Sequence, residues 1–277
     1  ILRKQHMKIE LERTNSVKSY VQNQLGVKMK NFWQLSMAVL LLLGCDAQEK
    51  DLTADQIISK AVEAHGGRLY NNMEVQFDFR GRHFRARISE GSYEFERTYE
   101  ADGRLVKDLI KNDKYQRILD QREIQLKESD LSNYKTATNT VIYFALLPYN
   151  LDNPVVNRQL MRSVEIKGEQ YYKVEITYGI NGGGKDFEDV YVYWIHRDNF
   201  TIDYLAYSFN INGGGVRFRE AYNARTVNGI RFQDYINYTI EKDYPAQELD
   251  YAFVSNQLKE ISRIDLDNIQ VSLLSTE

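Results

Sequence analysis

Between residues 170 and 240 the chain alternates with a period of two residues, and this pattern constrains the fold more than any other feature. Residues 170–178, 190–195 and 230–240 are rich in β-branched and aromatic types, and they alternate between apolar and polar side chains or between two apolar sets. Such segments are typical of strands with at least one buried face. The sequence therefore predicts successive strands of an antiparallel sheet.

The region from residue 75 to residue 127 has the same character. Short strand-like segments alternate there with turn sequences such as Glu90-Gly91, Asp102-Gly103 and Asp120-Gln121. Because these turns suit tight hairpins, we expect a meander in which each strand pairs with the next.

Two helices interrupt the strands. Thr53 and Gln56 have the spacing of a capping box, and the helix that they open is expected to end at His65, with a charge that suits the helix dipole. A second helix is expected from residue 129 to residue 147, where Pro148 stops it. Since its C-terminal half is strongly apolar, it must be buried, and the concave face of the sheet is the available place.

The predicted fold class is therefore mainly β (α+β). We expect a strongly curved antiparallel sheet, or half-barrel, with a few helices covering its concave face.

Composition narrows the class of partner. The chain has 277 residues, and Tyr is its most frequent aromatic residue, which suits strands with one apolar and one hydrated end. Residues 46–277 contain 29 Lys or Arg and 37 Asp or Glu, a net charge of about −8. A nucleic-acid partner is not expected, because phosphates require a basic face.

The N-terminal region has the pattern of a lipoprotein precursor. Residues 29–44 combine a lysine with a short apolar segment, which predicts a signal peptide too short to span a bilayer. Leu42-Leu43-Gly44-Cys45 resembles a bacterial lipobox, in which the cysteine is acylated. Lipidation of Cys45 would anchor the protein durably in a membrane. A buried cysteine at the end of an apolar helix is the alternative.

Four segments follow from this interpretation. Residues 1–28 are interpreted as an upstream extension outside the native protein, residues 29–44 as the signal peptide and residues 45–52 as a tether. Residues 53–277 are expected to form a single β domain. The expected location is the cell envelope, with the acyl anchor in the outer membrane and the protein on its periplasmic or surface side.

Two glycine-rich loops share the sequence Ile-Asn-Gly-Gly-Gly. Two strands and one turn separate them, so both are expected at the same rim of the sheet. Their residues are Asn181, Gly182, Gly183, Gly184, Asn212, Gly213, Gly214 and Gly215. Tight hairpin turns are one interpretation, and a flexible lip over a cavity is another. A phosphate-binding loop is disfavoured, because the required Lys-Ser/Thr spacing and following helix are missing.

Catalytic and metal-binding patterns are weak. His65, His83 and His196 lack the spacing of a metal site, and the single cysteine excludes a cysteine-based zinc cluster. No motif for a serine nucleophile is present. A carboxylate pair for glycoside hydrolysis stays open among the many Asp and Glu residues. We expect no metal and no cofactor, and enzymatic activity is the less favoured option.

Several motifs carry a resemblance to a known family. They are His65-Gly66-Gly67, Phe77-Asp78-Phe79-Arg80, Tyr143 to Tyr149, Glu188-Asp189-Val190-Tyr191, Tyr204 to Phe209 and Arg217 to Asn223. With the lipobox, they resemble an uncharacterised lipoprotein family of Bacteroidetes over residues 54–266. The order of elements is distantly similar to the LolA/LppX type of periplasmic lipoprotein carrier. That similarity implies a half-barrel whose apolar hollow, plugged by helices, holds acyl chains.

We therefore hypothesise that the protein is a non-catalytic lipoprotein of the cell envelope. It would act as a carrier or sensor that binds a lipid or other apolar ligand in the hollow of its sheet. A monomer is expected. Candidate lining residues are Phe77, Phe79, Tyr172, Val174, Ile176, Trp194, Tyr204, Ile236 and Tyr238. The alternatives are a structural or interaction module with a filled core and, less favoured, an envelope hydrolase or lyase.

Overall fold

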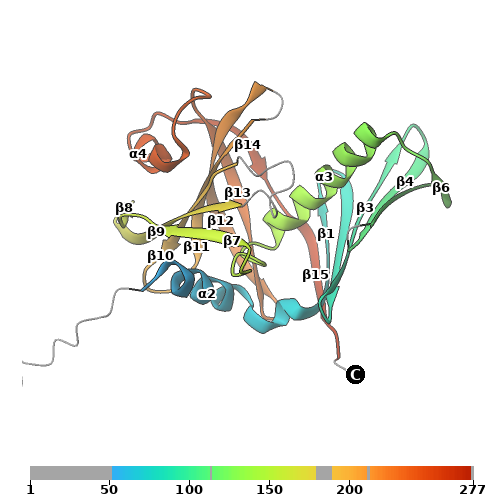
Figure 1. Ribbon diagram of the computed structural model, residues 1–277, viewed down its shortest axis with the longest axis horizontal. Coiled ribbons are helices and arrows are strands. Elements are labelled where there is room, and N and C mark those ends of the chain that lie inside the picture. The colour runs from blue at the N-terminus through green and yellow to red at the C-terminus, as the bar shows by residue number, and fades with distance from the viewer. Residues whose placement is uncertain (1–51, 113, 179–188, 211–212, 276–277) are drawn as a thin grey trace, which may run out of the picture. The chain divides into compact units, whose positions relative to one another are not determined.

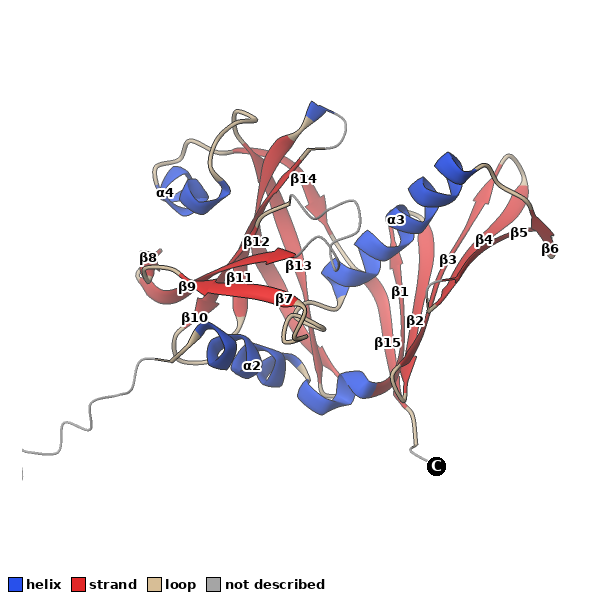
Figure 2. Ribbon diagram, viewed as in Figure 1, coloured by secondary structure: helices blue, strands red, loops and turns tan. Residues whose placement is uncertain are grey.

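Two antiparallel sheets and the helices packed on them make up the fold (Figure 1, Figure 2). The structure is a computed structural model, and it describes residues 52–275 except residue 113, residues 179–188 and residues 211–212. The antiparallel, mainly β fold expected from the sequence is confirmed. Its strands belong to two sheets rather than to one continuous curved sheet.

The first sheet has seven strands in the order β15-β1-β2-β3-β4-β5-β6. Its strands are β1 (Asn72–Phe79), β2 (Arg82–Ser89), β3 (Ser92–Ala101), β4 (Arg104–Lys111), β5 (Lys114–Leu119), β6 (Arg122–Ile124) and β15 (Asp267–Leu273). The expected meander from β1 to β6 is confirmed. The chain's last strand, β15, pairs with β1 at one edge of this sheet, and local sequence patterns did not predict that pairing.

The second sheet has eight strands in the order β14-β13-β12-β11-β10-β9-β7, with β8 pairing to β9. Its strands are β7 (Val156–Leu160), β8 (Val164–Ile166), β9 (Glu169–Tyr178), β10 (Tyr191–His196), β11 (Ile202–Phe209), β12 (Gly215–Val227), β13 (Ile230–Thr239) and β14 (Lys259–Ile264).

Tight turns fix the register of the hairpins. Asp102 and Gly103, between β3 and β4, have φ angles of 52° and 71°, and the pairs Glu90-Gly91 and Asp120-Gln121 are likewise left-handed at both residues. Two consecutive positive φ angles match the twist of the flanking strands, which explains why these short turn sequences predicted hairpins correctly.

The first helix, α2 (Ala54–His65), begins with the predicted capping box between Thr53 and Gln56, and a 3-10 helix, η1 (Gly67–Asn71), follows it. The expected charge on His65 is wrong. This side chain is 1% exposed, and burial lowers its pKa to about 4. Its Nδ1–H donates to the Ala61 carbonyl at 2.8 Å, while its Nε2 accepts from the Ile202 N–H at 3.5 Å. The imidazole is therefore neutral at neutral pH and has no favourable charge–dipole interaction.

The second predicted helix is α3 (Glu128–Ala145), which runs between the two sheets (Figure 1). It lies against β3 and β4 of the first sheet. Its C-terminal residues Ile142, Phe144 and Ala145 enter the main hydrophobic core. The expected burial of this apolar segment against a sheet is therefore confirmed.

Two hydrophobic clusters occupy opposite faces of the second sheet. The inner cluster lies between the sheets and includes Tyr193 and Ile195 of β10, whereas Val192 and Trp194 of the same strand belong to the outer cluster. Two short helices, η4 (Ala246–Glu248) and α4 (Leu249–Val254), cover the outer cluster. The second sheet is therefore apolar on both faces.

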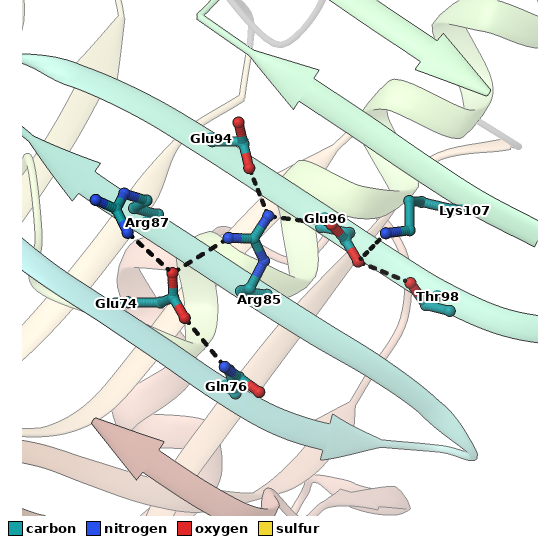
Figure 3. Close-up of polar contacts among 8 residues, drawn as sticks. All are labelled: Glu74, Gln76, Arg85, Arg87, Glu94, Glu96, Thr98 and Lys107. Carbon is teal, nitrogen blue, oxygen red and sulfur yellow. Dashed lines mark hydrogen bonds and ion pairs between the residues drawn. The ribbon is translucent and has the colours of Figure 1, made fainter. Parts of the chain in front are cut away.

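The outward face of the first sheet is charged instead (Figure 3). Arg85 of β2 lies between Glu74 of β1 at 3.2 Å and two glutamates of β3, Glu94 at 2.5 Å and Glu96 at 3.2 Å. Lys107 of β4 extends this ladder to Glu96. Charged cross-strand pairs are typical of a solvated sheet face.

Candidate ligand-binding cavity

A cavity of about 400 Å³ lies under the C-terminal half of α3. Its walls are α3, residues 147–156 after that helix, and the inner face of β9, β10, β11 and β12. The cavity thus lies between a helix and the second of the two sheets.

Tyrosines form much of the wall. They are Tyr143, Tyr149, Tyr178, Tyr191, Tyr193 and Tyr207. On the sheet they form a continuous layer, since the rings of Tyr178 and Tyr191 are edge to face at 5.9 Å and those of Tyr191 and Tyr207 stack at 5.8 Å. Burial raises the pKa of Tyr193 well above its usual value and also raises that of Tyr149. These neutral side chains present apolar ring faces together with hydroxyl groups.

Aliphatic and aromatic side chains complete the apolar part of the wall. They are Phe144, Leu147, Leu151, Val155, Val156 and Leu205. On the α3 side the wall also contains the exposed Thr136 and Thr140 and the half-buried Asn139. The cavity thus has exposed polar side chains along α3 and is mainly aromatic towards the sheet.

Arg219 of β12 is the charged residue of the described wall. Its side chain is 8% exposed, and its Nη2 donates to the Tyr207 hydroxyl at 3.1 Å. The guanidinium carbon lies 5.2 Å from the ring centroids of both Tyr207 and Phe144, at cation–π distance. Among the described residues, no carboxylate lies within ion-pair distance of Arg219, and its buried Nε–H has no acceptor.

Arg158 of β7 fixes the loop that follows α3. Its Nε donates to the Leu151 carbonyl at 2.7 Å and its Nη2 to the Asn153 carbonyl at 2.5 Å. Its Nη1 also contacts Asp55 in the first turn of α2 at 3.0 Å. One buried guanidinium therefore ties this wall of the cavity to both the second sheet and α2.

The nine side chains expected to line the hollow are divided between two clusters, and none of them lines this cavity. Phe77, Phe79, Val174 and Ile176 lie in the inner cluster, and Tyr172 packs against it. Trp194 and Tyr204 lie in the outer cluster, Tyr238 packs against that cluster, and Ile236 is half-buried on β13. Phe79 contacts a lining residue from behind the wall, because its ring packs edge to face at 5.4 Å against that of Phe144.

The residues that do line the sheet side of the cavity are sequence neighbours of those expected. Tyr193 precedes Trp194, and Leu205 follows Tyr204. A shift of one residue along a strand moves a side chain to the opposite face. Since both faces of β10 and β11 are apolar, the alternation alone did not identify the inner set. The segment from Tyr143 to Tyr149 was the informative sequence feature, since four of its residues line the cavity.

Part of the sequence-based site falls beyond the structure. Cys45, the loop residues 181–184 and Asn212 lie outside the described residues. Gly213, Gly214 and Gly215 border a separate small hollow of about 180 Å³, together with Phe209 and Lys242.

The described residues hold neither a metal-binding cluster nor a membrane-spanning helix. They contain no cluster of three or more His, Cys, Asp or Glu side chains suited to a metal ion. Within the same part of the chain, no helix has the length and hydrophobicity needed to span a membrane.

Comparison with known proteins gives a family and several loosely similar structures. The model described as Family of unknown function (DUF6503) matches residues 30–265. No curated protein matches the chain. A LolA superfamily protein from Nitrosomonas europaea has 15% identity and a TM-score of 0.44 over 82% of this chain and 96% of that one.

Two further structures are similar at lower TM-scores. A DUF1329 family protein from Desulfovibrio piger has 9% identity and a TM-score of 0.37, over 79% of this chain and 93% of that one. The lipoprotein LppX from Mycobacterium tuberculosis has 15% identity and a TM-score of 0.27, over 58% of this chain and 89% of that one.

Proposed function

The chain belongs to DUF6503, a family of unknown function, and from its own geometry we propose that it binds an apolar or amphiphilic small molecule in the cavity under α3. The observation that carries this proposal is the cavity itself. Its volume of about 400 Å³ falls within the range of roughly 300–1,000 Å³ typical of small-molecule sites.

The composition of the wall supports the same function. Binding sites for small molecules are largely apolar and aromatic, with a few placed polar groups. Here twelve of the eighteen described lining residues are aromatic or aliphatic, five are Asn or Thr, and Arg219 is the charged group of the described wall. The described wall contains no Asp, Glu, His, Cys or Ser that could act as a nucleophile or general base, so we favour binding over catalysis at this cavity.

The wall formed by α3 gives a ligand a route of entry. Tyr143 is 43% exposed and Thr140 is exposed, although both line the cavity. A ligand could therefore enter along the side of α3 without unfolding either sheet. Because Arg158 donates to two carbonyls of the following loop, those of Leu151 and Asn153, we expect the helix rather than that loop to adjust during entry.

The proposal includes a place in the cell. Residues 29–45 have the pattern of a lipoprotein signal, so we propose that an acylated Cys45 tethers the domain to a membrane of the cell envelope, as a carrier or sensor of its ligand. The test is incorporation of radiolabelled palmitate into the expressed precursor. Label should appear on the wild-type chain and disappear in Cys45→Ala; label that persists in the variant would contradict the anchor.

A blocked-cavity variant tests the binding function. Thr140→Trp places an indole at a cavity-lining position of α3, and Asn133→Trp places the same group at an exposed position of the same helix away from the cavity. We expect the wild-type domain and the Asn133 variant to take up cis-parinaric acid with fluorescence enhancement, and the Thr140 variant to bind at least tenfold more weakly. Equal affinity for all three proteins, or no uptake by the wild type, would refute the function.

A further inference from the structure

The wall of the cavity carries a positive charge that has no negative partner in the described structure. Arg219 is about nine-tenths buried, and the other described lining residues are uncharged. An arginine side chain keeps its proton under all conditions in which a protein is folded. A buried histidine or lysine can lose its charge by releasing a proton. The Arg219 guanidinium does not, so its positive charge stays in the cavity wall.

Burial of an unpaired cation is costly. Desolvation of the charge is repaid only where an opposite charge or hydrogen-bond acceptors replace the lost water. The Tyr207 hydroxyl and the two nearby rings offset part of that cost, but the Nε–H still has no acceptor among the described residues. An anionic oxygen in the cavity would supply the missing partner.

From this arrangement we propose that the ligand is a long-chain carboxylate whose head group pairs with Arg219 while its chain contacts the aromatic wall. The inference rests on the proposed function, since it names the class of molecule that the cavity takes. A planar guanidinium can pair with both oxygens of one carboxylate. Tyr207 strengthens the head-group site, because its oxygen accepts from Arg219 and its own O–H proton can be donated to the ligand.

The charge balance favours a carboxylate over a phosphate. A phosphate monoester carries a charge of about −1.5 to −2 at neutral pH. The described wall offers one positive charge, and no lysine, histidine or second arginine belongs to it. A singly charged head is neutralised by Arg219 alone, whereas a second negative charge would be buried without a partner.

Calorimetric titration tests this assignment. The probes are dodecanoate, its methyl ester, dodecyl phosphate and acetate, each titrated into the wild-type domain and into Arg219→Met and Arg219→Lys. We expect the wild type to bind dodecanoate at least tenfold more tightly than the ester or the phosphate, and to bind acetate weakly. The Met variant should bind acid and ester equally, and the Lys variant should keep part of the preference for the acid.

The outcomes separate the inference from the proposed function. If the wild type binds ester as tightly as acid, or if Arg219→Met keeps the preference, the carboxylate assignment is overturned while the cavity still binds apolar chains. If the phosphate binds more tightly than the acid, the assignment is likewise overturned. If neither acid nor ester binds the wild type, both the assignment and the binding function fail.

A spectroscopic readout distinguishes direct pairing from a structural effect. Dodecanoate labelled with carbon-13 at its carboxyl group reports its own protonation by NMR. An adjacent positive charge lowers a carboxyl pKa by roughly one to three units, so we expect the bound pKa to lie below that of the free acid in the wild type. In Arg219→Met the bound pKa should rise above the free value. If the pKa of the bound carboxyl group is the same in Arg219→Met as in the wild type, the carboxylate does not contact Arg219.

Discussion

The two halves of α3 cover two buried arginine sites that are built differently. Under the N-terminal half, Arg97 of β3 and Arg117 of β5 share the carboxylate of Asp108 of β4, with distances of 2.5–3.0 Å. Tyr115 also donates to that carboxylate at 2.5 Å, and Asp108 is fully buried. Under the C-terminal half, Arg219 has a tyrosine hydroxyl and two rings as partners but no carboxylate among the described residues.

This difference separates a structural site from a binding site. The Asp108 site is saturated, since both carboxylate oxygens accept from two or more donors and the Arg117 guanidinium also lies over the Tyr134 ring of α3. A buried polar network of this kind rigidifies the part of the fold that it connects. The Arg219 site is open to a cavity and lacks a negative charge, which is the arrangement that a ligand can complete.

The largest effect is expected from Asp108→Asn. Removing the shared carboxylate charge leaves two arginines buried without a negative partner, and breaking a buried ion pair from one side costs about 3–5 kcal/mol. Urea unfolding followed by circular dichroism measures the loss in free energy of unfolding. Asp120→Asn, at an exposed ion pair with Arg104, is the matched control and should not shift the transition measurably. Equal shifts for both variants would show that the buried network contributes no more to stability than an exposed ion pair.

A second expected effect concerns pH. His65 avoids the problem of a buried cation by losing its proton, because burial lowers its pKa to about 4 from about 6.5. The unfolded chain then binds more protons than the folded chain between these two values. Stability should therefore be complete above pH 6.5 and fall by about 3 kcal/mol as the pH is lowered through 4. Urea unfolding at a series of pH values measures this slope.

The variant His65→Gln identifies the group responsible for the slope. It should remove most of the decrease in stability between pH 6.5 and pH 4, because glutamine does not titrate. His83→Asn changes a histidine on β2 whose side chain is 46% exposed, and the slope should persist in that variant. A slope that survives in His65→Gln would assign the acid sensitivity to other groups.

Local patterns predicted the parts of the fold that depend on neighbouring residues. The hairpins followed from turn sequences such as Asp102-Gly103, and α2 followed from the Thr53 capping box. The pairing of β15 with β1 joins residues almost 200 positions apart, and no local signal specifies such a contact. The division into two sheets was therefore not predicted, although most of the strands were; β7 and β8 were missed as well.

The candidate site was harder to predict than the fold, for two physical reasons. Strands β10 and β11 are apolar on both faces. The sequence pattern therefore does not distinguish Tyr193 from Trp194, although their side chains lie on opposite faces of the sheet. Arg219 and Asp108 are charged residues on strands, and such residues usually mark a solvated face. Their burial depends on α3, which covers them from a distant part of the chain.

A smaller effect is expected when the cavity arginine is replaced. Arg219→Met removes a buried charge that has no carboxylate partner, so the unliganded domain should keep its stability or gain about 1 kcal/mol. Arg117→Met makes the same change in the saturated site and should be strongly destabilising, because Asp108 loses two hydrogen bonds there. Thermal unfolding without ligand compares the two variants. Similar losses for both would remove the distinction between the two sites.

The smallest effect is expected on the outward face of the first sheet. Arg85 contacts three glutamates there, more carboxylates than Arg97 contacts, yet its side chain is 24% exposed rather than 8%. Water and salt screen such ion pairs, so Arg85→Ala should cost less than about 1 kcal/mol and still less at high salt. Arg97→Ala should cost several times more and should respond little to salt. If the number of ion pairs rather than burial set the energy, the order of these two variants would be reversed.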